Sequence, residues 1–148
     1  MMIINMRLKT LIGITILLLG IGTATAQPQE KKKKDTYKAS VYLFGFSASF
    51  NDSIVYFTDI QKVDNVLLEK KTNFLLSRDQ YSYQLRDFLA NQKGQPNRTC
   101  ITMFATSRKN AEKEYLNLQK LYTAKAKGKY DVRMLATDFV YVRVEEDE

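Results

Sequence analysis

Residues 99–136, TCITMFATSRKNAEKEYLNLQKLYTAKAKGKYDVRMLA, predict a strand, a helix and a second strand in succession. Residues 99–106 are apolar on both faces, which is typical of a central strand, and Ser107 can cap the helix that follows. Gly128 should end that helix, and residues 130–136 form the next strand. We expect these two strands to be parallel, with a right-handed connection. The helix should bury Ala111, Tyr115, Leu118 and Tyr122, with Leu116 and Leu121 widening this stripe.

Two further strands are expected upstream. Residues 37–49 and 54–60 are rich in Val, Tyr, Phe and Ser, and they flank a turn at residues 50–53. This pattern predicts an antiparallel hairpin. Residues 63–76 carry two apolar clusters around a charged centre. Their spacing leaves two alternatives open, a short helix or an irregular loop.

A second helix is predicted between the hairpin and the crossover unit. Ser77 and Gln80 fit a capping box, in which the Ser hydroxyl accepts from a free backbone amide and the Gln side chain reaches back to the cap. The helix should end near residues 91–94, where Gly94 lies. Its buried stripe consists of Tyr81, Leu85, Phe88 and Leu89.

The chain after the crossover unit predicts a closing hairpin. Residues 139–144 alternate in polarity, with three valines expected on one face, and Thr137 and Asp138 can form the turn before them. The predicted element order is therefore β-β-α-β-α-β-β. This order indicates an α+β fold, a two-layer domain with a mixed sheet of about five strands and two main helices.

The first 26 residues are typical of an export signal. Arg7 and Lys9 precede an apolar run at residues 11–21, and small residues lie at 24–26, which predicts cleavage before Gln27. The run is too short to span a bilayer, and no later run approaches that length. We therefore expect a signal at 1–26, a disordered basic arm at 27–36, one domain at 37–144 and an acidic tail at 145–148. The product should be periplasmic or extracellular, with no transmembrane segment.

The composition excludes several kinds of chemistry. The chain has no histidine and one cysteine, so a Ser-His-Asp triad, a His-ligated metal site and an internal disulfide are impossible. We expect Cys100 to be buried, and no cofactor or metal is predicted. Removal of the signal lowers the net charge from +7 to about +5. In an exported protein this favours anionic glycans or phospholipid headgroups over nucleic acid, although it is also typical of a solvated surface.

One candidate binding site lies at the start of the helix that is predicted to follow residues 99–106. Free backbone amides at a helix N-terminus attract anions, and ligands of open sheets bind beyond the carboxyl ends of strands. The same pattern also fits an ordinary helix cap followed by solvated basic residues. The candidate residues are Thr106, Ser107, Arg108 and Lys109.

Two other residue types could carry a function. A histidine-free glycosidase needs two facing carboxylates, but the spacing singles out no pair, and no catalytic residue is assigned. Tyrosines could form an exposed platform for sugar rings or pack in the core. The available acids are Asp52, Asp59, Asp64, Asp79, Asp87, Glu112, Glu114, Asp131 and Asp138, and the chain has 9 Tyr.

Three parts of the chain resemble known proteins. The export signal together with residues 41–47, VYLFGFS, and 81–87, YSYQLRD, resembles small exported proteins of Bacteroidota bacteria, which implies a location and no activity. Residues 99–144 are similar to the sporulation-related repeat domain, which implies binding of peptidoglycan glycan strands. That domain ends in a helix and one strand, where this chain predicts a terminal hairpin. Residues 52–54, DSI, resemble the acceptor for O-glycosylation in exported Bacteroidota proteins, which implies a sugar on Ser53.

These observations predict an exported, non-enzymatic binding or interaction module. Its expected partner is an anionic envelope glycan or another envelope protein. Two alternatives stay open, a small hydrolase that uses paired carboxylates and a secreted effector. A cleft with two converging acids would favour the hydrolase.

Overall fold

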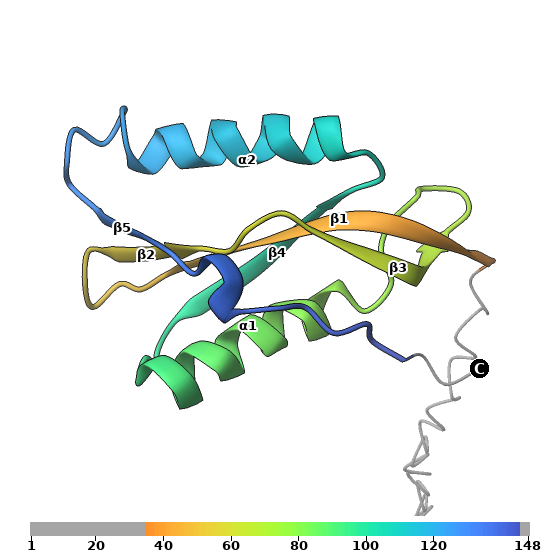
Figure 1. Ribbon diagram of the computed structural model, residues 1–148, viewed down its shortest axis with the longest axis horizontal. Helices are drawn as coiled ribbons and strands as arrows, with labels where there is room; N and C mark the ends of the chain where they lie inside the picture. The colour runs from red at the N-terminus through yellow and green to blue at the C-terminus, as the bar shows by residue number, and fades with distance from the viewer. Residues whose placement is uncertain (1–34, 146–148) are drawn as a thin grey trace, which may run out of the picture. The chain divides into compact units, whose positions relative to one another are not determined.

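The computed structural model describes residues 35–145, which form a mixed five-stranded sheet with one helix on each face (Figure 1). This confirms the α+β class and the mixed sheet with two helices. The elements in chain order are β1 (Thr36–Ala48), β2 (Ile54–Phe57), β3 (Gln61–Glu69), α1 (Arg78–Lys93), β4 (Thr99–Ala105), α2 (Arg108–Tyr122), β5 (Asp131–Met134) and a short 3-10 helix, η1 (Ala136–Asp138). The predicted signal and most of the basic arm and acidic tail lie outside the described residues.

The long strand β1 is the centre of the sheet. It pairs antiparallel with β4 along one edge, whereas β3 and β2 share its other edge, with Leu43 opposite Gln61 and Phe46 opposite Phe57. Strand β5 pairs parallel with β2. Strands β4 and β5 therefore run in the same direction, as the crossover unit predicts, but β1 and β2 separate them.

Strand β4 is an edge strand, so its expected central position is wrong. Among the described strands it pairs only with β1, and on its outer side the Thr102 amide donates to the Ser82 hydroxyl of α1, at 2.9 Å. Its apolar residues face helices on both sides of the sheet. That sandwiching produces the sequence pattern of a central strand without a second neighbouring strand.

Strand β3 covers the first part of residues 63–76, where we expected either a short helix or an irregular loop. The strand has nine residues, of which seven pair antiparallel with β1, and the register shifts between Ala39 and Val41. At this bulge Asn65 has a φ of 58°. The bulge places Val63 and Val66 on the same buried face at a spacing of three, which imitates a helix in the sequence.

The helix ends agree only in part with expectation. Ser77 has a φ of 49° and its side chain caps nothing, so the capping box is wrong; its carbonyl instead accepts from the Gln80 amide at 2.9 Å. Gly94, with a φ of 63°, ends α1 as expected. Ser107 caps α2 as expected, with its hydroxyl accepting from the Asn110 amide at 3.3 Å. Helix α2 ends at Tyr122, and turns lead from there to Gly128.

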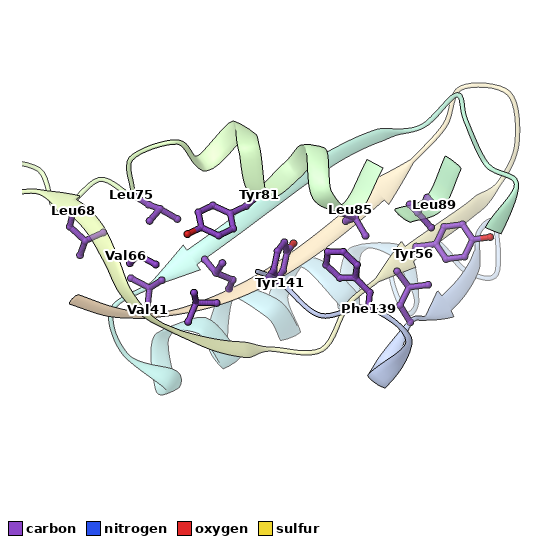
Figure 2. Packing of buried hydrophobic residues seen from close by; sticks show 13 residues of the cluster. Val41, Tyr56, Val66, Leu68, Leu75, Tyr81, Leu85, Leu89, Phe139 and Tyr141 are labelled. Atoms are coloured by element: carbon purple, nitrogen blue, oxygen red, sulfur yellow. The ribbon is translucent and has the colours of Figure 1, made fainter. Parts of the chain in front are cut away.

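The face of the sheet under α1 carries the larger core (Figure 2). The stripe Tyr81, Leu85 and Leu89 of α1 is buried, as expected, and Phe88 packs at its side. The buried cluster also contains Val41, Leu43, Tyr56, Val63, Val66, Leu68, Leu75, Leu135, Phe139 and Tyr141.

The C-terminal segment is held by side chains, so the expected closing hairpin is wrong. No strand is formed at residues 139–144; Phe139 and Tyr141 are buried in the α1-side core, whereas Val140 and Val142 are exposed. The Gln61 side chain bonds the Phe139 carbonyl and the Tyr141 amide, each at 2.8 Å. Alternating polarity indicates an extended backbone with one buried face. A segment that packs on the core in an extended conformation has the same pattern, even when it does not pair with a neighbouring strand.

A second glutamine repeats this arrangement further along the segment. The Gln84 side chain bonds both the carbonyl and the amide of Val142, at 2.7 and 2.9 Å, and the Val144 amide donates to the Tyr81 hydroxyl at 3.2 Å. A Cβ on Gly45 would lie 2.4 Å from the Tyr141 oxygen, so this glycine makes room for the segment.

The face of the sheet under α2 is packed more thinly. Its buried cluster consists of Phe46, Val55 and Phe57, with Tyr115, Leu118 and Tyr122 partly buried against them. Phe44 is also buried on this face, where its ring contacts that of Tyr115. The side chains of Leu116 and Leu121 are 49% and 47% exposed, so they do not widen the buried stripe as expected. No helix in the described part of the chain is long and apolar enough to cross a bilayer.

Candidate functional site

The predicted anion corner is an exposed turn between β4 and α2. Thr106, Arg108 and Lys109 are exposed, and the Ser107 hydroxyl is occupied by the helix cap. The Arg108 Nε donates to the Glu112 carboxylate at 2.8 Å, one helical turn away. This pair reduces the positive potential at the corner, which leaves Lys109 as its main source of charge. Whether an anion docks at these four residues stays a prediction.

The net positive charge of the described residues comes from α2 and the turn after it. Residues 108–129 contain seven Lys or Arg and two Asp or Glu, whereas the other described residues contain ten of each. The layer formed by residues 108–129, which we call the α2 layer, therefore carries a net charge of +5 on a neutral remainder. Such an asymmetry attracts negatively charged partners to one side of the molecule.

A shallow groove of about 360 Å³ lies beside α2, next to Met103 of β4. Its apolar lining is Met103 of β4 with Leu118 and Leu121 of α2. Ile101, 43% exposed, lies two residues from Met103 and so on the same face of β4. We call this surface the α2 groove. It combines apolar side chains that the fold leaves half covered.

Lysines dominate the rim of the α2 groove. Lys120 and Lys125 line it together with Asn117 and one acid, Glu114. Within residues 35–145, neither lysine is in an ion pair. Their charges are therefore available to a partner. Sequence reasoning missed this groove; the signal was that Leu121 lies outside the narrow stripe that a helix buries.

Most of the candidate acids form ion pairs within the described fold. Six of the nine candidates are in ion pairs: Asp52, Asp64, Asp87, Glu112, Asp131 and Asp138. The amide of Ile54, with help from Arg98, lowers the pKa of Asp52, and hydrogen bonds from Lys62 and Ser40 lower the pKa of Asp64. A general acid needs the opposite shift. No group of three His, Cys, Asp or Glu among the described residues could hold a metal.

A buried arginine is the most connected polar group of the fold. The Arg98 side chain is 1% exposed and donates to the Asp52 carboxylate at 2.9 Å and the Ser47 hydroxyl at 3.3 Å. It also donates to the Gln95 side chain at 3.2 Å and to the Ile54 carbonyl. Its guanidinium lies 4.9 Å from the centre of the Tyr56 ring. These bonds fix the turn between β1 and β2.

Neither the tyrosines nor the cysteine forms an open site. Of the nine tyrosines, all within the described residues, only Tyr83 is exposed, and Arg86 stacks on its ring at 4.5 Å. Cys100 is partly buried rather than fully buried, and desolvation raises the pKa of its thiol. A thiol with a raised pKa is a poor nucleophile.

No family model, curated protein or solved structure matches the chain, so the resemblances to exported Bacteroidota proteins and to the sporulation-related repeat stay predictions.

Proposed function

We propose that this chain is an exported, non-enzymatic binding module that holds an acidic envelope protein against its α2 layer. One observation carries this proposal: the net positive charge of the described fold and its apolar groove occupy the same layer. Protein interfaces typically combine an apolar centre with a polar rim. The α2 groove has that composition, with leucine and methionine inside and lysine outside.

Two features favour a protein over a glycan as the partner. A glycan site usually offers flat aromatic rings to the sugar faces, whereas Met103, Leu118 and Leu121 present aliphatic side chains. Tyr83 is the one exposed tyrosine in residues 35–145, and it lies on α1, on the other face of the sheet. An apolar side chain of the partner would fill the α2 groove, and acidic residues beside it would meet Lys120 and Lys125.

The groove is too small to bind tightly alone. A stable interface buries at least about 1,000 Å², so the partner must also cover the outer surface of α2. Lys109 and Lys113 lie on that surface and are exposed. The predicted corner at Thr106–Lys109 would then contribute charge at one end of a longer interface.

Photo-crosslinking in the native cell tests the proposal. A photoreactive residue at Leu121 should give discrete crosslinked products, whereas the same residue at Tyr83 should not. Tyr83 is the matched control because its exposure, 42%, is close to the 47% of Leu121, but it lies on α1, on the other face of the sheet. Changing Lys120 and Lys125 to Glu should reduce the product about tenfold or more, since each exposed rim charge contributes up to about 1 kcal/mol and its reversal adds repulsion. Equal crosslinking at Leu121 and Tyr83 would contradict the proposal.

A further inference from the structure

Phe50 is the most exposed apolar residue of the described fold, and nothing in residues 35–145 covers it. Its relative exposure is 104%, at the tip of the turn between β1 and β2. A phenylalanine in water gains free energy when it is buried, by an amount that is large for one side chain. A ring that is exposed in full at a turn is therefore available for a contact outside the fold.

The side chain of Arg98 holds the chain on both sides of the Phe50 turn. Arg98 bonds Ser47 before the turn, and Asp52 and Ile54 after Phe50. Asp52 in turn accepts from the Ile54 amide at 2.9 Å. A buried guanidinium is costly unless its donors are used, and three of the four groups that it bonds belong to this hairpin. Arg98 thus fixes the chain on both sides of the turn that carries Phe50.

Lysines lie at the same end of the sheet. The Asp131 amide donates to the Ser53 carbonyl at 3.0 Å, which places the turn after α2 beside the Phe50 hairpin (Figure 1). Lys127 and Lys129 in that turn are exposed and form no ion pair within the described part of the chain. The two acids nearby, Asp52 and Asp131, are paired with arginines.

We propose that this end of the molecule, Phe50 with Lys127 and Lys129, docks on an anionic lipid surface. Lysines near an anionic bilayer are attracted to its headgroups. An aromatic ring can pass between the headgroups and reach the boundary with the acyl chains. A membrane fits this end better than a protein pocket, because Phe50 is fully exposed at a turn and the charges at this end that form no ion pair in the described part of the chain, Lys127 and Lys129, have one sign. The contact is separate from the α2 groove and does not depend on the function proposed for it.

Sedimentation with vesicles tests the docking. The chain from Gln27 onward should sediment with vesicles of phosphatidylcholine and phosphatidylglycerol, and much less with phosphatidylcholine alone. Phe50→Ala should weaken binding about tenfold, and Lys127→Gln and Lys129→Gln about fivefold each. Added salt should weaken the remaining electrostatic attraction.

Matched controls lie at the other end of β1. Phe74→Ala removes another exposed phenylalanine, and Lys38→Gln with Lys71→Gln removes two other exposed lysines that form no ion pair in the described fold; both should leave sedimentation unchanged. Leu121→Glu should also sediment like wild type, which separates this contact from the α2 groove. Phe50→Ala should leave the unfolding midpoint unchanged. Binding that is indifferent to Phe50, or wild-type protein that stays in solution with both vesicles, would overturn the proposal and favour a protein pocket for Phe50.

Discussion

The two faces of the sheet differ in how completely their side chains are buried. Thirteen buried residues form the cluster under α1, whereas three form the one under α2. The α1 face is also covered by the C-terminal segment, which puts Phe139 and Tyr141 into the core. The α2 face keeps half-exposed leucines and the net positive charge of the described fold. We infer that the α1 side supplies most of the stability, and that the α2 side is left free to bind.

A pair of leucine truncations gives the largest expected difference between the faces. Leu85→Ala on α1 removes a fully buried side chain and should cost about 3 kcal/mol of unfolding free energy, whereas Leu118→Ala on α2 should cost about 1 kcal/mol. Urea denaturation of the two variants measures both values. Equal losses would show that the α2 face contributes as much core as the α1 face.

The tyrosines of the two faces should differ in alkaline solution. Burial raises the pKa of Tyr141 strongly and that of Tyr115 less, so the ionised form of each is disfavoured in the folded state. The resulting stability is complete below the ordinary tyrosine pKa of about 10 and is lost as the pH rises from there toward the folded pKa.

Variants of the two tyrosines measure this difference. Tyr141→Phe should remove more of the pH dependence of unfolding above about pH 10 than Tyr115→Phe does. Tyr141→Phe also leaves the Thr102 hydroxyl without its partner at 2.9 Å, so the slope with pH, and not the stability at neutral pH, is the readout. A steeper slope for Tyr141→Phe than for wild type would contradict this expectation.

The smallest expected effect concerns the attachment of the C-terminal segment. Gln84→Met removes two bonds to the exposed Val142 backbone and should cost less than about 1 kcal/mol. Gln61→Met, whose bonds to Phe139 and Tyr141 are partly buried, should cost about twice as much.

Amide exchange can locate these losses. In Gln84→Met the Val142 amide should exchange faster while the amides in the middle of α2 do not change. Faster exchange throughout both helices would mean that the glutamine supports the whole fold and not only the segment. That result would remove the distinction between a stabilising face and a binding face.

The local sequence determined the elements whose signals lie within a few residues. Ser107 caps α2 and Gly94 ends α1 because each needs only its own backbone and near neighbours. The hairpin of β1 and β2, the α1 stripe and the parallel direction of β4 and β5 follow from periodicity and connection rules. Among the candidate binding residues, the corner at Thr106–Lys109 was predicted in this way, because a helix start is a local feature.

Tertiary structure alone decided the rest, since those features depend on residues far apart in the chain. The bulge at Asn65 hides β3 from a simple count of alternation, and Gln61 and Gln84 reach 58 to 80 residues along the chain to hold the C-terminal segment. The α2 groove likewise requires Met103 of β4 to lie beside Leu121 of α2. The sequence shows which side chains are apolar, but only the packing of the folded chain determines which of them remain exposed.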